Sequence, residues 1–190
     1  MKNTALVVID LINDIVHPDG KISSPSLFIS ENHVIEKNNT VINYARKNQL
    51  LIIFVRVVFD SLYRVCSPVS PVFQHVKKQN ALQLNTWGTK FHDKLDKQGQ
   101  DIVIEKHRIS AFYSTPLEMY LKCNKVENIL ITGVSTDLAI ESTAREAHDR
   151  DYKVSIIEDA CGASSKDLHE NSLKIISKIA TVISSSQFDL

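Results

Sequence analysis

The stretch Ile129-Leu-Ile-Thr-Gly-Val-Ser-Thr-Asp-Leu-Ala-Ile-Glu-Ser-Thr-Ala-Arg145 passes from a short apolar run through a tight turn into a helical pattern. The run Ile129–Thr132 lacks alternation, which is typical of a strand covered on both faces of a parallel sheet. Gly133 to Asp137 forms the turn, and Leu138 to Arg150 is predicted to be a helix. A strand followed by a helix in this way is the building unit of a doubly wound α/β sheet.

The rest of the chain repeats this unit. Three further strands are predicted at Ala5–Ile9, Leu51–Val58 and Val154–Ile157, two weaker ones at Ile102–Ile104 and Thr181–Ile183, and helices at Asn32–Asn48, Thr115–Lys122 and Asp167–Ile179. We therefore predict a single domain over residues 1–190, with a doubly wound, mostly parallel six-stranded sheet and helices on both faces. Residues 59–100 contain Pro68, Pro71 and Gly88 with weak periodicity, which predicts loops and short helices over the sheet edge.

Composition excludes several classes of protein. Lysine plus arginine and aspartate plus glutamate both number 22, so charge gives no reason to expect a nucleic acid or an anionic membrane as partner. No apolar run reaches the ~18 residues of a membrane span, and no signal peptide is recognisable. The cysteines Cys66, Cys123 and Cys161 are odd in number and form no CxxC, which suits a reducing compartment; we expect a cytoplasmic protein.

Neither a cofactor nor a metal ion is expected. The chain has five glycines and no glycine-rich phosphate loop, which argues against dinucleotide binding. Its histidines show no metal-ligand spacing, and Asp60 is followed by Ser-Leu-Tyr rather than by a histidine. The predicted partner is a small-molecule substrate.

In doubly wound sheets the ligand crevice lies at the carboxyl ends of the strands. Asp10 ends the first strand there, where it could be a general acid or base, or only a turn former. Lys106 could hold a carboxylate ionised or lie on the surface. The turn Gly133–Asp137 could offer backbone amides to an oxyanion, although Thr136 or Asp137 could equally be only a helix cap. Further strand-end residues are Asn13, Asp14, Arg56–Asp60, Glu105, His107, Arg108 and Glu158–Asp159.

Taken together, these segments resemble the isochorismatase-like hydrolases, a superfamily that includes cysteine amidohydrolases and the isochorismatases themselves. The resemblance spans nearly the whole chain and rests on Ala5-Leu-Val-Val-Ile-Asp-Leu-Ile-Asn-Asp14, Ile104-Glu-Lys-His-Arg-Ile-Ser-Ala-Phe112, Ile131–Arg145 and, more weakly, Trp87-Gly88-Thr89. It implies a homo-oligomer, a dimer or a tetramer.

The resemblance also implies a set of site residues. The family's Asp-Lys-Cys triad carries over to Asp10, Lys106 and the position of Ala139, so the cysteine nucleophile is missing. A non-proline cis peptide at Val134–Ser135 is implied as well, which would turn the Ser135 to Ala139 amides toward the substrate carbonyl. The implied substrate and oxyanion residues are Val134, Ser135 and Leu138.

Three interpretations of Ala139 remain open. The chain could derive from a hydrolase of amide or ureido C–N bonds, as inactive variant or natural departure, because the segment around residue 139 otherwise resembles the cysteine branch. It could be an isochorismatase-type enzyme, which cleaves a vinyl ether with the aspartate as general acid and water as nucleophile. It could also bind a small ligand without turnover. The dianion isochorismate would need cations in the crevice, for which Arg56, Lys90 and Arg108 are candidates.

Overall fold

The computed structural model describes residues 3–188 and contains a six-stranded sheet. Its strands are β1 (Thr4–Ile9), β2 (Leu51–Val57), β3 (Ile102–Lys106), β4 (Asn128–Val134), β5 (Lys153–Gly162) and β6 (Thr181–Ile183). All five neighbouring pairs are parallel, and the strand order is β3-β2-β1-β4-β5-β6. This is the predicted doubly wound sheet, and its direction of winding reverses between β1 and β4.

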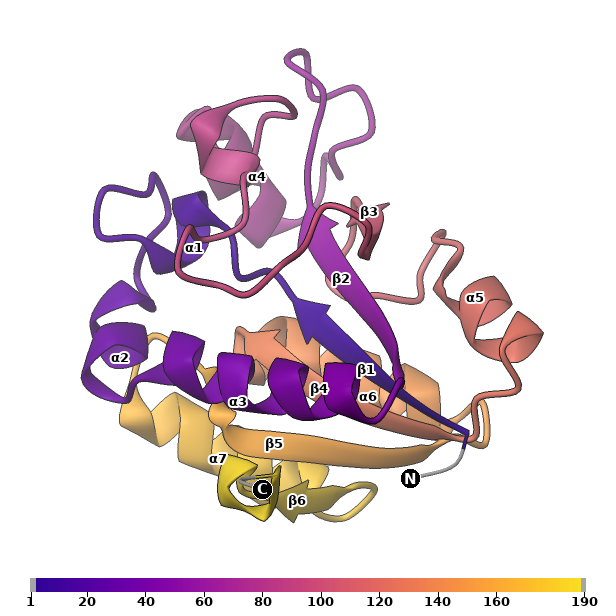
Figure 1. Cartoon of the computed structure of the whole chain (residues 1–190). Coiled ribbons are helices and arrows are strands. Elements are labelled where there is room, and N and C mark those ends of the chain that lie inside the picture. The colour runs from indigo at the N-terminus through magenta and orange to yellow at the C-terminus, as the bar shows by residue number, and fades with distance from the viewer. Residues whose placement is uncertain (1–2, 189–190) are drawn as a thin grey trace.

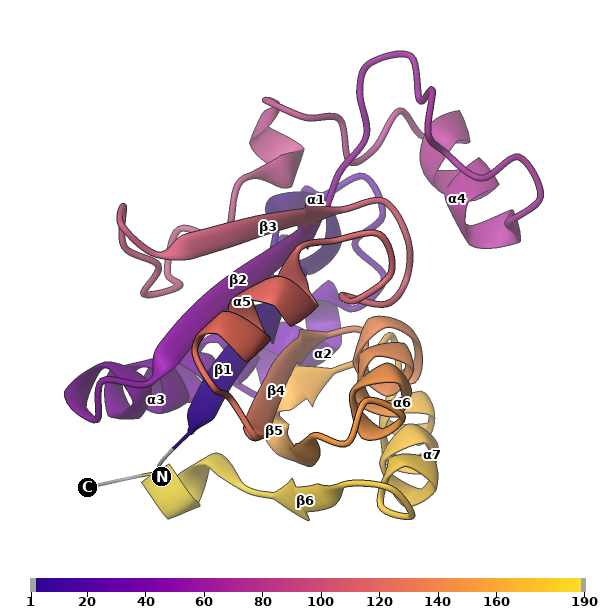
Figure 2. The same ribbon diagram turned by 90° about the vertical axis from the view of Figure 1, so that its right-hand side faces the viewer.

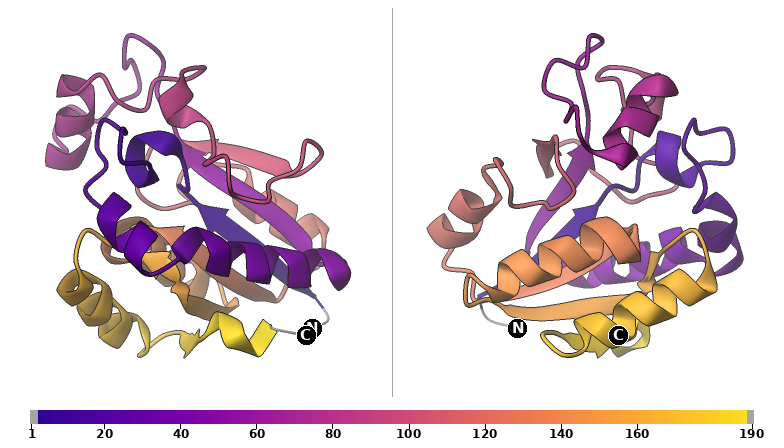
Figure 3. Two further views of the ribbon diagram at one scale, coloured as in Figure 1. Left: turned by 60° about the vertical axis from the view of Figure 1, so that its left-hand side comes forward. Right: turned by 180° about the vertical axis from the view of Figure 1, so that it is seen from behind.

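Helices cover both faces of the sheet. One face packs against α2 (Ser26–Glu31) and α3 (Val34–Lys47), and the other against α5 (Leu117–Cys123), α6 (Glu141–His148) and α7 (Lys166–Ile176). Figure 1 shows α3 in front of the strands, and the rear view in Figure 3 shows α6 and α7 on the opposite face. Successive residues of β1 point alternately into the two apolar layers, so this strand is buried along its whole length.

The predicted helix from Leu138 begins differently from the expected form. The chain first makes one turn of π-helix, η2 (Thr136–Ile140), and only then the α-helix α6. Ser135 is the N-cap and gives no side-chain cap hydrogen bond. The alternative in which Thr136 or Asp137 serves as the cap is therefore wrong; the Thr136 hydroxyl instead lies 2.8 Å from Nδ1 of His169.

Two other boundaries differ from the prediction. Strand β5 runs on to Gly162, so Glu158 and Asp159 lie within it, and Asp159 accepts hydrogen bonds from the amide and hydroxyl of Ser185 at 2.7 Å. The predicted position of Asp159 in the crevice is therefore wrong. The short helices α1 (Asn13–Val16) and α2 were not predicted, because four to six residues are too few to establish a helical period.

The irregular segment between β2 and β3 contains α4 (Pro71–Lys78) and the 3-10 turn η1 (Trp87–Thr89). It has an apolar cluster of its own, in which Phe59 and Phe73 pack with their ring centroids 5.4 Å apart. Figure 2 shows α4 beyond the carboxyl end of β2. The segment therefore extends past the strand ends, where the winding of the sheet predicts a ligand. Within residues 3–188, no helix has the length and apolarity needed to cross a bilayer.

Gly133 allows β1 and β4 to lie side by side at the point where the winding reverses. It pairs with Ile9 and has a φ of 115°, a backbone conformation that side chains with a Cβ rarely adopt. A Cβ at this position would overlap the carbonyl oxygen of Ile9. Both observations require glycine here.

Replacing Gly133 with alanine should therefore lower the free energy of unfolding by about 3 kcal/mol or more. Urea denaturation followed by circular dichroism would measure the change. Gly99→Ala is the matched control, because an added Cβ there meets no atom within 4 Å, and it should cost no more than about 0.5 kcal/mol. Equal stability of the two variants would contradict this account of Gly133.

Candidate active site

Asp10 stands at the end of β1 in a left-handed backbone conformation, with φ at 56°. Its amide donates to the Val55 carbonyl at 2.9 Å, and its Oδ1 accepts from the Val57 amide at 2.7 Å. The side chain is buried, with the residue only 3% exposed. Both β1 and β2 thus orient this carboxyl group.

Lys106 ends β3 and reaches the same point from the next strand. Its Nζ lies 2.7 Å from Oδ2 of Asp10 and also donates to the carbonyls of Arg108 at 3.1 Å and Ile109 at 2.9 Å. An ammonium group has three hydrogens, so this buried group is fully bonded. Lys106 therefore positions Asp10 and the turn that follows β3, with no donor left over for a ligand.

Burial raises the pKa of the Asp10 carboxyl group above its ordinary value of 3.8. The charge and hydrogen bond of Lys106 and the Val57 amide act in the opposite direction, and desolvation outweighs them. Asp10 consequently holds a proton at a higher pH than an exposed aspartate does. The raised pKa makes Asp10 a better proton donor to a bound ligand than an ionised surface aspartate would be.

The end of β4 supplies the opposite side of the site. The Val134–Ser135 peptide bond is cis, in agreement with what the family resemblance implies. Ala139 is 4% exposed on η2, and the Leu138 side chain is 39% exposed. The Leu138 amide donates to the Ser135 carbonyl at 3.1 Å. Leu138 therefore faces the site with its side chain, since its amide is already bonded within the turn.

Helix α7 supports η2 from behind. The Ser172 hydroxyl donates to the Thr136 carbonyl at 3.0 Å and lies 2.8 Å from Oε2 of Glu141. The other carboxylate oxygen of Glu141 accepts from Arg145, one helical turn further on, at 2.8 Å. Burial lowers the pKa of His169, which favours the neutral ring beside Thr136. These contacts hold the π-helical turn against α7.

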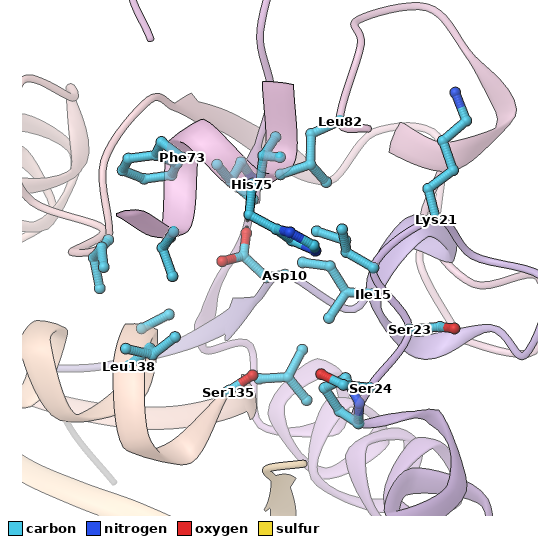
Figure 4. A pocket seen from close by; sticks show the side chains of 18 of the residues that line it. Asp10, Ile15, Lys21, Ser23, Ser24, Phe73, His75, Leu82, Ser135 and Leu138 are labelled. Atoms are coloured by element: carbon cyan, nitrogen blue, oxygen red, sulfur yellow. Dashed lines mark hydrogen bonds between the residues drawn. The ribbon is translucent and has the colours of Figure 1, made fainter. Parts of the chain in front are cut away.

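A cavity of about 420 Å³ joins these elements, and all six predicted site residues line it: Asp10, Lys106, Val134, Ser135, Leu138 and Ala139. Figure 4 shows the Asp10 carboxyl group and the side chains of Ser135 and Leu138 around one space. The methyl group of Ala139 thus faces the same cavity as the buried acid.

Sequence reasoning missed most of the cavity wall. The apolar part consists chiefly of Ile15, Ile22, Phe73, Val76, Leu82 and Ile109, and the added polar groups include Lys21, Ser23, Ser24 and His75. In Figure 4 the His75 ring points into the cavity, whereas the Lys21 ammonium points away from it and donates to the Asn80 carbonyl at 2.7 Å. The only sequence signal for His75 was its place in the irregular segment.

Of the three cations proposed for the crevice, the structure places only Arg108 there. Arg56 and Lys90 line a separate groove beside β3, so their expected position was wrong. Arg56 bonds to Glu105 at 2.6 Å and to the Thr89 carbonyl at 2.9 Å. The physical reason is that Arg56 and Glu105 are in register on neighbouring strands and pair on the sheet face away from the cavity.

Neither the acidic residues after β1 nor the cysteines add a group to the cavity. Asp14 is buried and accepts from the Leu82 amide at 2.7 Å, which is a structural role. Cys66, Cys123 and Cys161 are free thiols outside the cavity lining. Within residues 3–188, no three His, Cys, Asp or Glu side chains are grouped closely enough to hold a metal ion.

Comparison with known proteins gives a consistent result. The isochorismatase domain model matches residues 4–187. An isochorismatase family protein from Burkholderia thailandensis is 29% identical, with a TM-score of 0.79 over 97% of this chain and 92% of that one. An N-carbamoylsarcosine amidase from Thermoplasma acidophilum is 25% identical, with a TM-score of 0.75 over 96% of both chains. The fold also matches an isochorismatase family protein from Desulfovibrio vulgaris at a TM-score of 0.88, with 21% identity over 100% and 97% of the two chains.

The raised pKa of Asp10 predicts a measurable titration. Its carboxyl carbon, followed by NMR, should titrate above pH 3.8, and in Lys106→Met the midpoint should rise further because the neighbouring positive charge is lost. Since the folded pKa exceeds the unfolded one, the folded protein holds the proton more tightly. The Asp10 contribution to the free energy of unfolding is therefore present at low pH and declines as pH rises through the folded pKa.

Asp10→Asn serves as the control, because it should remove this decline from the dependence of stability on pH. A carboxyl group that titrates below pH 3.8 in the wild-type protein would contradict the assigned balance of burial and charge.

Proposed function

The chain belongs to the isochorismatase family, and on that basis we propose that it hydrolyses a small molecule by general-acid catalysis from Asp10, with water as the nucleophile. The relatives named above support the hydrolase class. The reaction class that best suits the residues of this chain is cleavage of a vinyl ether.

The observation that carries this proposal is the pairing of a protonatable Asp10 with Ala139 in one cavity. A methyl group cannot attack a substrate, so any covalent route through residue 139 is closed. A buried carboxyl group with a raised pKa can still donate a proton to a substrate beside it. The cavity volume of about 420 Å³ also lies within the range of small-molecule sites.

Cleavage of a vinyl ether needs little more than this acid. Asp10 transfers its proton to the terminal alkene carbon, and the ether oxygen stabilises the resulting cation as an oxocarbenium ion. Water adds to the cationic carbon that bears the ether oxygen, which gives a hemiketal, and returns a proton to the Asp10 carboxylate. The hemiketal then collapses to a ketone and an alcohol. Lys106 stabilises the carboxylate while Asp10 is ionised, because its ammonium lies 2.7 Å away.

A second candidate is an amide or ureido hydrolase framework from which the nucleophile is missing. The 25% identity to an N-carbamoylsarcosine amidase favours it, as does the position of Ala139 at the start of the helix that follows β4. Here the unaltered chain would bind a substrate of this kind without efficient turnover. A binder that never turns over any ligand is the third interpretation.

The first prediction from this proposal concerns Asp10. The wild-type protein should hydrolyse vinyl ethers, isochorismate among them, and Asp10→Asn should reduce kcat by about 10²–10⁴-fold because the proton donor is lost. In D₂O the product methyl group should carry one deuterium from the solvent, which mass spectrometry detects. Arg56→Met, outside the cavity, should leave kcat unchanged. A wild-type protein that is inactive on all vinyl ethers tested would reject the proposed reaction.

The second prediction concerns position 139. Under the amidase alternative, Ala139→Cys should create hydrolysis of ureido or amide substrates that iodoacetamide abolishes, with a covalent intermediate visible by mass spectrometry. Asp10→Asn combined with Ala139→Cys is the matched control and should be inactive. A folded Ala139→Cys protein without activity across such a panel would eliminate the amidase alternative.

A further inference from the structure

We propose that Arg108 is the anchor for a single carboxylate, and that the substrate of this cavity is a small monoanion with an apolar body. This inference rests on the proposed function for the idea that a substrate binds here, and it adds the chemical class of that substrate.

The position of Arg108 is set by the buried lysine two residues before it. Lys106 donates to the backbone carbonyls of Arg108 and Ile109, so the turn after β3 is wrapped around the ammonium group. Both residues of the turn line the cavity. The arginine is thus part of a fixed turn at the edge of the site, and ordering it on ligand binding should cost little.

The guanidinium group is held at one nitrogen only. Nη1 donates to the carbonyls of Val65 at 2.9 Å and His107 at 2.7 Å. Over residues 3–188 no carboxylate lies within ion-pair distance of Arg108, and its Nη2 and Nε make no hydrogen bond to the protein. Two parallel donors are therefore left for a ligand, which is the arrangement in which arginine binds carboxylates.

The other charges of the cavity are already compensated or directed elsewhere. Lys106 lies 2.7 Å from Asp10 and uses its other hydrogens on the Arg108 and Ile109 carbonyls, so it has no donor left for a ligand. Lys21 donates to the Asn80 carbonyl, and its ammonium points out of the cavity. The lining contains no acid besides Asp10. The His75 ring is a further polar group of the lining. Among the lining residues Arg108 is thus the cation with donors left for a ligand, which suits one negative charge rather than two.

The wall between Arg108 and Asp10 suits an apolar body. Its large side chains are aliphatic or aromatic, namely Ile15, Ile22, Phe73, Val76, Leu82 and Leu138. A second carboxylate placed in this cavity would lose its hydration and find only neutral hydroxyl donors, at Ser23, Ser24 and Ser135, in place of a second cation. A dianion such as isochorismate should therefore bind less well than a monocarboxylate of similar size.

Binding of unreactive probes tests the inference without any turnover. Benzoate, benzamide and phthalate would be titrated into the wild-type protein and into Arg108→Met by calorimetry. Benzoate should bind the wild-type protein more tightly than benzamide or phthalate does. Arg108→Met should weaken benzoate binding about 10–100-fold, as expected for loss of charge-assisted hydrogen bonds, with little change for benzamide.

Three further variants make the result specific. Arg56→Met and Lys90→Met each remove a cation from the separate groove beside β3, and both should bind benzoate as the wild-type protein does. Arg108→Lys keeps the charge and should recover part of the affinity, which separates loss of the anchor from loss of the fold. Equal benzoate affinity in Arg108→Met, equal affinity for benzoate and benzamide, or no benzoate binding would each overturn the proposal.

Activity assays on vinyl ethers with the wild-type protein and Arg108→Met, run beside these titrations, separate this inference from the proposed reaction. Selective benzoate binding that depends on Arg108, in a protein inactive on vinyl ethers, would support the anchor and reject only the reaction. Turnover of a vinyl ether with the same KM in Arg108→Met and the wild-type protein would support the reaction and reject the anchor.

Discussion

The buried ion pair between Asp10 and Lys106 is the interaction on which the geometry of the site depends. Each charge alone would cost several kcal/mol to remove from water, and the pair is tolerated because every polar atom has a partner. Those partners come from the ends of three adjacent strands: the carboxyl group from β1, the Val57 amide from β2 and the ammonium from β3. The pair thereby holds together the strand ends on one side of the point where the winding reverses.

The chemistry of the site depends on which donors and which proton the Asp10–Lys106 pair can still offer to a ligand. Lys106 uses all of its hydrogens on Asp10 and on the turn after β3, so it acts on the substrate only through its charge. Asp10 keeps a raised pKa despite that charge, because burial is the stronger effect. Across the cavity, β4 and η2 present the methyl group of Ala139 where a nucleophile would otherwise stand. The result is an acid with a positive neighbour and an apolar wall.

The strands and the position of Asp10 could be predicted from the sequence. Buried parallel strands consist of uninterrupted apolar runs, and Asp10 directly follows such a run. The side of the sheet on which a residue lies was harder to predict. Lys106 pairs with Val57, the last residue of β2, whereas Arg56 lies one residue earlier and pairs with Glu105. Its side chain therefore points to the opposite face of the sheet. The contribution of His75 depends on how the segment between β2 and β3 folds back over the strand ends, and weak periodicity gives no information about that. The π-helical start of the helix after β4 has no sequence signature that we recognise.

Ala139 differs from Gly133 and from the Asp10–Lys106 ion pair in what its substitution would disturb. Gly133 tolerates no side chain because the neighbouring strand occupies the space, and removal of either member of the ion pair leaves a charge stranded in the interior. Ala139, in contrast, is a buried residue that also lines the cavity, and it takes part in none of these strand contacts. If Asp10 is the acid as proposed, one codon at this point would separate a covalent from an acid-driven reaction, a property that would favour evolutionary divergence in reaction type.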